Sequence, residues 1–379
     1  MKQVFIICLF MMVFLAQTHA QQRKRLREYG IKIGVLPTGK LNAITDVAGV
    51  QVGQVTLNKG TEVRTGVSAI LPHAGNLFQE KVLAAVYVGN GFGKLAGSSQ
   101  VQELGNLESP IILTNTLSVA TAMNAVITHT LQQPGNEKVQ SVNALVGETN
   151  DGGLNDIRGR HVTEKHVLEA IQKAKDGEVE EGNVGAGTGT ICFGFKGGIG
   201  TSSRKLPPSL GGYTVGVLVQ TNFGGVLQIA GAPVGEELER FSFRQQIMEK
   251  ADGSCMIVVA TDAPVDARNL ERMAKRAMLG LGKTGGIASN GSGDYVISFS
   301  AHPGLRVPYE SRERTQTVTL LRNDEMSPLF MATIEATEEA ILNSLFKAET
   351  IVGKDKNKVE ALPLEKTLDI LKKHHVIKP

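Results

Sequence analysis

One dipeptide in the second half of the chain places a hydroxyl group beside a residue that tolerates backbone strain. Gly253 and Ser254 stand where a polar segment gives way to the apolar, β-branched run 255–261. The Ser254 hydroxyl can attack the Gly253 carbonyl, because glycine hinders that attack little and accepts unusual backbone angles. Hydrolysis of the resulting ester would leave Ser254 as a new N-terminus, whose α-amine, with an ordinary pKa of about 8, can act as a general base. The pair therefore predicts self-cleavage that creates an N-terminal nucleophile.

Local sequence alone leaves a second interpretation open at this position. A Gly-Ser pair before an apolar run is also typical of a turn that enters a strand. The same holds for Asn290-Gly-Ser-Gly-Asp294, which precedes the strand expected at 295–301, because Asn-Gly is a common turn signal. Whether these two stretches are simple turns or parts of a catalytic site therefore depends on the rest of the chain.

Further stretches rich in glycine, amide and acidic residues follow one another from Asn42 to Pro363. They are Asn42-Ala-Ile-Thr-Asp-Val-Ala-Gly-Val-Gln-Val-Gly53, Arg64-Thr-Gly-Val67, Pro110-Ile-Ile-Leu-Thr-Asn-Thr116, Glu148-Thr-Asn-Asp-Gly-Gly-Leu-Asn-Asp156, Val184-Gly-Ala-Gly-Thr-Gly189, Phe195-Lys-Gly-Gly-Ile-Gly-Thr-Ser-Ser-Arg204, Gln220-Thr-Asn-Phe-Gly224, Asp252-Gly-Ser254, Gly291-Ser-Gly-Asp294 and Ala361-Leu-Pro363. In this order they resemble the family of L-aminopeptidase/D-amidase-esterases and β-aminopeptidases, which are self-processing serine aminopeptidases similar to N-terminal-nucleophile hydrolases. The resemblance covers nearly the whole chain after residue 41.

The resemblance implies a role for each of five side chains. Ser254 would be the nucleophile, Ser292 would relay a proton toward it, and Asp294 would orient or ionise that relay. Asn222 would donate its amide hydrogen to the oxyanion, and Glu148 would face the free amine of the substrate. Each of two residues also has a purely structural alternative. Asn222 could hydrogen-bond the backbone of its own loop, and Glu148 could be a solvated acid in a loop.

Two positions depart from the family pattern. Asn150 stands where L-aminopeptidase members carry a tyrosine thought to help bind the oxyanion, and Asp294 stands where some relatives carry glutamate. Asparagine can donate a hydrogen bond but reaches less far than tyrosine. Asn150 is therefore expected to bind substrate, and the preference for L-, D- or β-amino-acyl groups stays open.

Two other functions remain alternatives. One is an amino-group acyltransferase of the self-cleaving ornithine acetyltransferase type, although those proteins typically carry a threonine nucleophile. The other is a non-processed binding protein on the same fold. The expected activity is a hydrolase that releases N-terminal residues from short peptides, amides or esters through an acyl-enzyme on Ser254.

Composition and short motifs disfavour several other classes of protein. A net charge of +3, without clusters of Lys and Arg interleaved with aromatic residues, disfavours a nucleic-acid partner. His161 and His166 are five residues apart, which is the wrong spacing for one helix face, and no cysteine pair has zinc spacing. Gly282-Lys-Thr284 lacks the first glycine of a phosphate-binding loop, because Ala277 stands in its place. We therefore expect neither a metal nor a cofactor.

The first twenty residues have the pattern of a secretory signal peptide. Lys2 precedes the apolar run 4–16, which is too short to span a bilayer, and Thr18-His-Ala20 is a small-residue cleavage site. The mature protein is then expected to be secreted or periplasmic, with no membrane association after removal of the signal. Residues 21–379 would form a single catalytic domain, cleaved into an α-chain (21–253) and a β-chain (254–379).

Hydrophobic periodicity and turn signals place the elements that must position these residues. The expected strands are 82–88, 109–114, 142–147, 213–220, 254–261, 295–301 and 315–322, and the expected helices are 116–131, with Thr116 as N-cap, 163–175, 265–281, 327–347 and 363–374. This order lacks the regular alternation of a doubly wound sheet and fits an α+β fold. The resemblance implies a four-layer αββα sandwich and a homo-oligomer, a tetramer of αβ pairs.

The remaining stretches carry structural expectations. Residues 21–41 are expected to form an irregular basic arm, and 231–253 an exposed loop before the cleavage site. The glycine-rich stretch 182–204 favours close packing of chain against chain over an anion cradle. Cys192 and Cys255 are expected to be buried free thiols, and Cys255 should point to the face of its strand opposite Ser254.

Overall fold

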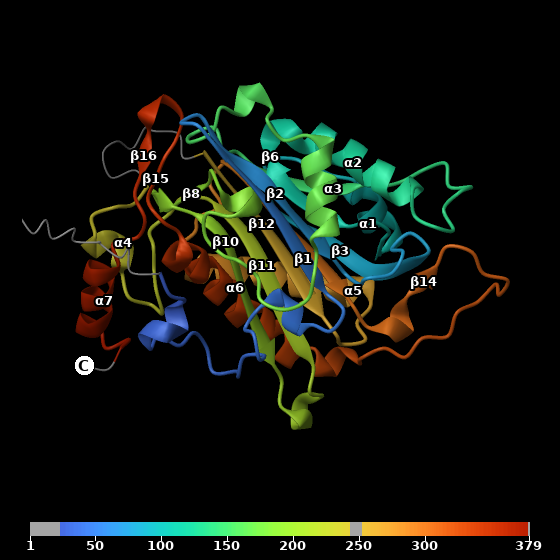
Figure 1. The fold of residues 1–379 in the computed structure, drawn as a ribbon. Coiled ribbons are helices and arrows are strands. Elements are labelled where there is room, and N and C mark those ends of the chain that lie inside the picture. The colour runs from blue at the N-terminus through green and yellow to red at the C-terminus, as the bar shows by residue number, and fades with distance from the viewer. Residues whose placement is uncertain (1–22, 243–251, 378–379) are drawn as a thin grey trace, which may run out of the picture.

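The computed structural model describes residues 23–242 and 252–377, and its helices and strands are labelled in Figure 1. The strands are β1 (Gln51–Lys59), β2 (Val63–Leu71), β3 (Glu80–Gly91), β4 (Leu95–Ala96), β5 (Asn106–Leu107), β6 (Ile111–Asn115), β7 (Leu145–Thr149), β8 (Ile191–Cys192), β9 (Phe195–Lys196), β10 (Gly198–Lys205), β11 (Thr214–Asn222), β12 (Asp252–Thr261), β13 (Gly291–Ser300), β14 (Val307–Pro308), β15 (Ile351–Val352) and β16 (Lys358–Val359). The helices are α1 (Ser98–Leu104), α2 (Val119–Leu131), α3 (Glu164–Gln172), α4 (Val234–Glu237), α5 (Ala267–Lys283), α6 (Ser327–Lys347) and α7 (Leu364–Lys373).

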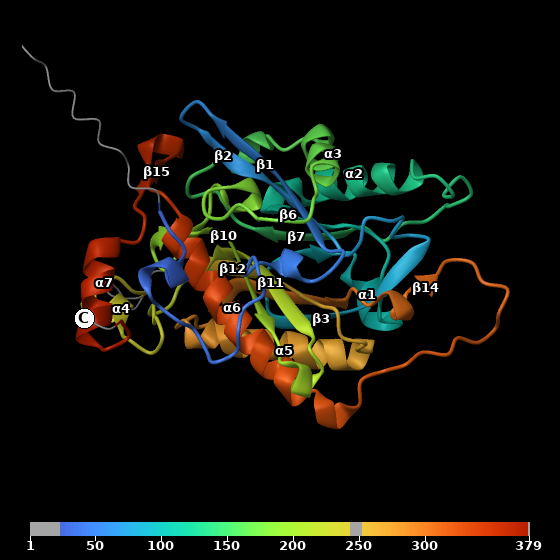
Figure 2. The ribbon, with the colours of Figure 1, turned by 60° about the horizontal axis from the view of Figure 1, so that its bottom comes forward.

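Two facing sheets form the centre of the molecule. The smaller has the order β1-β2-β6-β7-β4, and the larger has the order β10-β11-β12-β13-β3-β14, with β5 paired to β3. Figure 2 shows α2 and α3 outside the smaller sheet and α5 and α6 outside the larger one. The predicted αββα sandwich is therefore confirmed.

Alternation along each strand divides the apolar side chains among three layers. In β12, Met256, Val258 and Ala260 belong to the cluster between the two sheets. Cys255, Ile257 and Val259 point the other way, into the cluster shared with α5 and α6. This two-residue period is the normal consequence of strand geometry. A third cluster lies between the smaller sheet and the helices α2 and α3.

The glycine-rich stretch permits close approach of backbones, as predicted. A Cβ atom at Gly200 would lie 2.0 Å from the carbonyl oxygen of Ala340 in α6, and one at Gly187 would lie 2.4 Å from the nitrogen of Ile199. Only glycine leaves room for these contacts. Neighbouring backbone thus fills the space beside these two glycines.

A buried ion cluster joins segments that lie far apart in the sequence. Arg204 of β10 is completely buried and bonds Glu335 and Glu339 of α6 at 2.9 and 2.8 Å. Arg27 bonds Glu339 at 2.7 Å. The cluster therefore links residues that precede position 254 to residues that follow it.

The predicted helices are confirmed, with small shifts at their ends. Helix α6 begins at Ser327 and ends at Lys347, as the sequence indicated. Helix α5 begins two residues later than expected because Asp266 caps it, accepting a hydrogen bond from the backbone nitrogen of Asn269 at 2.9 Å.

The strand predicted at 315–322 is wrong. These residues belong to an irregular segment that extends from the body of the molecule at the edge near β14, and residues 311–320 are all exposed. The alternation of Thr and Val favours extended backbone, but in the described part of the chain no strand pairs with this segment, and Leu321 alone among its residues packs against the core. Propensity alone therefore gave a false strand.

Two segments that were expected to be irregular, 23–41 and 231–253, differ in part from the expectation. Residues 23–41 are irregular apart from a short 3-10 helix at Leu26–Tyr29, and they do not form a free arm, because Leu26, Ile31 and Ile33 are buried against the body. The predicted loop 231–253 contains the short helix α4, and its residues 243–251 lie outside the described part of the chain, as does the predicted signal at 1–20.

Cys192 and Cys255 are buried free thiols, as predicted. Within residues 23–242 and 252–377, every helix is too short or too polar to cross a bilayer.

Candidate active site

Ser254 lies near the start of β12, on the face of the larger sheet that points toward the smaller sheet. Strand β12 runs antiparallel to β11 and parallel to β13, so that Ser254 is in register with Asn222 on one side and Gly293 on the other. Ser254 shares its strand face with Met256 and is 4% exposed. The two neighbouring strands therefore fix the position of this residue closely.

Asn222 directs its amide group at the proposed nucleophile. Its Nδ2 donates to Ser254 Oγ at 3.4 Å, and its Oδ1 accepts from the backbone nitrogen of Ile191 at 2.9 Å. The second bond fixes which end of the amide points at Ser254. An amide nitrogen held in this way suits stabilisation of an oxyanion that forms beside Ser254. Asn222 thus does more than bond its own loop.

Gly253 lies next to Ser292, one of the residues expected to take part in cleavage of the Gly253–Ser254 bond. It is in register with Ser292 of β13. A Cβ atom at this position would lie 3.1 Å from the Cα atom of Phe223 and 3.2 Å from Ser292 Oγ. A side chain at this position would therefore be tightly confined, and the Ser292 hydroxyl lies against the Gly253–Ser254 region.

Ser292 and Asp294 form the expected hydroxyl–carboxylate pair. Ser292 Oγ donates to Asp294 Oδ1 at 2.8 Å, and both residues are 1% exposed. Burial raises the pKa of Asp294 to about 6, against the opposing effect of hydrogen bonds from the Ser292 hydroxyl and the Cys255 backbone. The pair lies inside β13, which begins at Gly291 and not after Asp294 as the sequence suggested.

Glu148 reaches the site from the smaller sheet, at the end of β7. It is 3% exposed, so it is not a solvated acid. Its carboxylate accepts from the backbone nitrogen of Lys94 at 3.0 Å and from the hydroxyl of Thr116. The expectation that Thr116 caps the following helix is wrong, because Ser118 occupies the N-cap position of α2 and the Thr116 hydroxyl binds Glu148 instead.

Asn150 is exposed at the wall of the site. Its Oδ1 accepts from the backbone nitrogen of Gly152 at 2.9 Å, which is a local turn bond. Its side chain therefore belongs to the loop that follows β7 and lines the cavity. The hydrogen bond to Gly152 keeps the side-chain oxygen on its own loop and does not join it to Ser254.

A cavity of about 490 Å³ brings the predicted residues together. Ser254, Asn222, Glu148 and Asn150 all line it, along with Gly253. Ser292 and Asp294 do not line the cavity and lie behind Gly253. The arrangement provides a hydroxyl nucleophile with an amide donor at one side and a buried carboxylate facing the same space.

Cys255, next to the proposed nucleophile, is excluded from this chemistry by its position. It points into the core shared with the helices and is completely buried. Burial raises the pKa of its thiol well above the ordinary value, so the thiol stays protonated.

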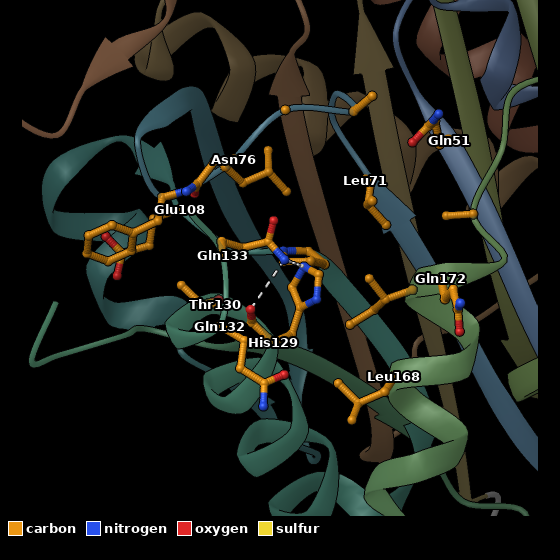
Figure 3. Close-up of a pocket in the computed structure, with 17 residues that line it drawn as sticks. Gln51, Leu71, Asn76, Glu108, His129, Thr130, Gln132, Gln133, Leu168 and Gln172 are labelled. Atoms are coloured by element: carbon orange, nitrogen blue, oxygen red, sulfur yellow. Dashed lines mark hydrogen bonds between the residues drawn. The ribbon is translucent and has the colours of Figure 1, made fainter. Parts of the chain in front are cut away.

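A second cavity, of about 460 Å³, lies between α2, α3 and the segment after β2 (Figure 3). Its lining combines side-chain amides with apolar residues, and Gln133 there donates to the backbone oxygen of His129 at 3.4 Å. The carboxylate of Glu108 at its wall is already paired with Lys81. None of the predicted site residues lines this cavity.

Three contributors to the candidate active site went unnoticed in the sequence. Lys94 and Thr116 hold Glu148, and Ile191 orients Asn222. Lys94 lies just after the glycine-rich end of β3 and bonds Glu148 through its backbone, and Ile191 also contributes only its backbone, which no side-chain pattern reveals. The Pro110–Thr116 motif is the one signal that pointed to Thr116.

Comparison with known proteins gives consistent matches. The model of peptidase family S58 matches residues 42–359. A β-peptidyl aminopeptidase, BapA, of Sphingosinicella microcystinivorans is 40% identical over 386 aligned residues, which cover 96% of this chain and 95% of that protein.

Two solved structures share the fold over almost their whole length. A β-aminopeptidase from Burkholderia sp. has 40% identity and a TM-score of 0.85, covering 92% of this chain and 99% of that one. The L-aminopeptidase D-Ala-esterase/amidase from Ochrobactrum anthropi has 34% identity and a TM-score of 0.85, covering 93% and 99%. The latter is described as a prototype for the serine aminopeptidases and as a new variant among the Ntn-hydrolase fold.

Proposed function

The chain belongs to peptidase family S58, and from this premise we propose that it is a self-processing serine aminopeptidase whose nucleophile is Ser254. It hydrolyses peptide or amide bonds, in keeping with the aminopeptidases to which it is similar. The observation that carries the assignment is the convergence of Ser254, Asn222 and Glu148 on one cavity, because it joins a nucleophile, an oxyanion donor and an amine-binding acid.

The first reaction converts the precursor into the active enzyme. Ser254 Oγ attacks the Gly253 carbonyl, and the peptide nitrogen of Ser254 leaves as its α-amine while the hydroxyl proton is transferred to it. Water then hydrolyses the ester and gives a carboxylate on Gly253. The Ser292–Asp294 pair lies against this bond and is the group placed to relay the proton.

The second reaction releases the N-terminal residue of a substrate. The new α-amine of Ser254 removes the proton from Oγ, which attacks the first carbonyl of the substrate. Asn222 Nδ2 stabilises the oxyanion that develops, an interaction whose removal costs roughly 3–4 kcal/mol in other enzymes. The leaving amine departs with a proton, and water frees the acyl group from Ser254.

Glu148 explains why the substrate needs a free amine. A buried carboxylate in a cavity is best stabilised by a cation that enters with the substrate. The substrate's ammonium group supplies that charge, whereas an internal peptide segment would not. An aminopeptidase thus follows from the same cavity that holds the nucleophile.

The finer points of the proposal rest on similarity. The relatives that are named for β-peptidyl or β-amino substrates favour a β-amino-acyl group over L- or D-α-amino-acyl groups. We also propose that residues 1–20 direct export, that Asn150 replaces the family tyrosine at the cavity wall, and that the processed pairs assemble as a homo-oligomer, with a tetramer as the leading state.

The intact mass of the purified protein tests the proposal directly. Two species are expected, one of residues 254–379 and one that ends at Gly253, and N-terminal sequencing of the smaller one should begin with Ser-Cys-Met. Ser254→Ala should give a single uncut chain without aminopeptidase activity. Cys255→Ala, which changes the buried neighbour, should still be cut and active.

An uncut wild-type chain that nevertheless hydrolyses amino-acyl p-nitroanilides would overturn the processing step. A cut chain whose bound acyl group passes to an added amine faster than to water would favour an acyltransferase. An uncut chain without turnover would favour a binding protein.

A further inference from the structure

Glu148 and Lys94 are the only charged residues that line the active-site cavity in the described part of the chain. Their ion pair is loose. Lys94 Nζ lies 3.9 Å from Glu148 Oε1, at the limit of an ion pair, and the Lys94 side chain is 58% exposed whereas that of Glu148 is 4% exposed. The cavity therefore presents a buried negative charge with a solvent-exposed positive charge beside it.

A comparison within the same protein shows that this pair is incomplete. Glu108 is equally buried, and Lys81 contacts it at 2.5 Å with a side chain only 16% exposed. Asn143 and Gln100 add neutral donors to that acid. Glu148, in contrast, has two neutral donors and a distant, solvated cation, which leaves room for an ammonium group of the substrate.

Occupation of this site by an ordinary substrate has an electrostatic cost. When the substrate's ammonium group binds Glu148, the Lys94 ammonium group remains beside it, and the two positive charges repel each other. A substrate that carries an anion close to its own amine removes this repulsion, because its anion can pair with Lys94 while its amine pairs with Glu148. Charge-assisted hydrogen bonds of this kind are the stronger ones in proteins.

We propose that Lys94 selects substrates whose amine-bearing carbon also bears a carboxylate, namely peptides acylated through the side-chain carboxyl group of aspartate. In such β-aspartyl peptides the free amine is β to the scissile carbonyl. They therefore have the backbone spacing of the β-amino-acyl group favoured above, with one added carboxylate. This inference rests on the proposed aminopeptidase function and deepens it to a substrate class.

The chemistry of release is unchanged by the added group. Ser254 Oγ attacks the side-chain carbonyl of the aspartyl residue, the amide nitrogen leaves as the free amine of the remaining peptide, and an aspartyl ester forms on Ser254. Water hydrolyses the ester to aspartate and restores the hydroxyl. A cavity of about 490 Å³ is within the range of about 300–1,000 Å³ that is typical of small-molecule sites.

The test compares two dipeptides that differ in one substituent. In β-aspartyl-leucine the amine-bearing carbon carries a carboxylate, and in 3-aminobutanoyl-leucine it carries a methyl group; both enantiomers of each are used. We expect the processed wild-type protein to have a higher kcat/KM for the aspartyl compound. Lys94→Met should lower the ratio of the two kcat/KM values by at least about tenfold, the effect of losing one hydrogen bond between charged groups, and Lys94→Arg should largely retain it.

The ratio of the two kcat/KM values is measured on one preparation of each variant. It is therefore independent of the fraction of that variant that folds. Lys366→Met, which changes an exposed lysine of α7, should leave both rates and their ratio unchanged. Preference of the wild type for 3-aminobutanoyl-leucine, or a ratio unaffected by Lys94→Met, would overturn the role of Lys94 while leaving the aminopeptidase function intact. Absence of turnover of either dipeptide by processed protein that hydrolyses amino-acyl p-nitroanilides would overturn the β-amino-acyl substrate class while leaving the aminopeptidase function intact.

Discussion

Asn222 is oriented by a backbone group of another element and not by its own strand. The nitrogen of Ile191, in the small β8–β9 hairpin, holds the amide oxygen and so directs the amide nitrogen toward Ser254. Since a free asparagine amide could flip, this single bond converts a polar side chain into a preorganised donor. At the scale of residues, the geometry of the site depends on such supporting contacts as much as on the proposed nucleophile.

Removal of this donor should affect catalysis and not folding. Asn222→Ala is expected to lower kcat for amide hydrolysis by about 100- to 1,000-fold, as loss of one oxyanion donor does elsewhere. The measurement is steady-state kinetics on the processed protein. Asn124→Ala, which changes an exposed asparagine of α2, serves as the control and should retain full activity. A fall of less than about threefold for Asn222→Ala would remove Asn222 from the oxyanion site.

The activity should fall in mild acid because of Asp294. Its pKa is raised from 3.8 to about 6, so the carboxylate that accepts from Ser292 becomes protonated as the pH falls below about 6. The same shift favours the protonated form in the folded state, so the stabilisation that it contributes is fully present below about pH 4 and is lost as the pH rises through about 6.

Activity and folding therefore respond to acid in opposite directions at this residue. Protonation of the Ser254 α-amine already lowers kcat/KM below about pH 8, and the pH profile should become steeper below about pH 6 while circular dichroism at the same pH values shows an intact fold. Asp294→Asn should be poorly active at every pH and lack this second, steeper limb. A wild-type profile that keeps a single slope down to about pH 4.5 would show that ionisation of Asp294 is not needed.

At the scale of elements, strand register explains how the site is assembled. Strands β11 and β13 flank β12 and bring Asn222 and Ser292 to it from opposite sides, and β7 of the other sheet brings Glu148. In the proposed reaction, the larger sheet carries the reacting groups and the smaller one carries the acid that would bind the substrate's amine. Under that proposal, specificity and chemistry are supplied by different sheets.

Close packing of helix α6 on strand β10 should make Gly200 intolerant of a side chain. A Cβ atom there would lie 2.0 Å from the Ala340 oxygen, so Gly200→Ala is expected to destabilise the protein by about 1–3 kcal/mol through overpacking. Gly282→Ala is the matched control, because nothing lies within 4 Å of its Cβ position in α5, and it should stabilise by about 0.4–1 kcal/mol. Urea unfolding measures both. Equal stabilities for the two variants would contradict the packing argument.

Periodicity in the sequence predicted the elements better than the contacts between them. The apolar faces of α5 and α6 and the β-branched run of β12 are strong local signals, and these elements were found almost as expected. The segment 315–322 has a similar local signal but no partner strand, which only tertiary structure reveals. The proximity of Lys94 and Thr116 to Glu148 likewise depends on how the strands pair, and sequence gave the residue types at the site but not these contacts.

At the scale of the whole molecule, the buried ion cluster fastens α6 to the part of the chain before residue 254. Glu339→Ala would leave Arg204 and Arg27 without a shared partner in a buried place, and should destabilise the protein by about 3–5 kcal/mol. Glu271→Ala removes an exposed partner of Lys275 and should cost less than about 1 kcal/mol. Thermal unfolding of processed protein compares the two. Similar losses in both would mean that the cluster adds nothing beyond a surface pair.

The strand order of the larger sheet has a further consequence for the reaction order of refolding. Strand β12 from Ser254 onward and strand β13 follow position 253 and lie between β11 and β3, which both precede it. If the bond at 253–254 is cut as proposed, the smaller chain contributes two central strands that lie between β11 and β3 of the larger chain. Before the cut, folding is unimolecular. After it, denatured protein must reassemble from two separate chains, so recovery would slow on dilution, and the precursor alone would be the efficient folding unit.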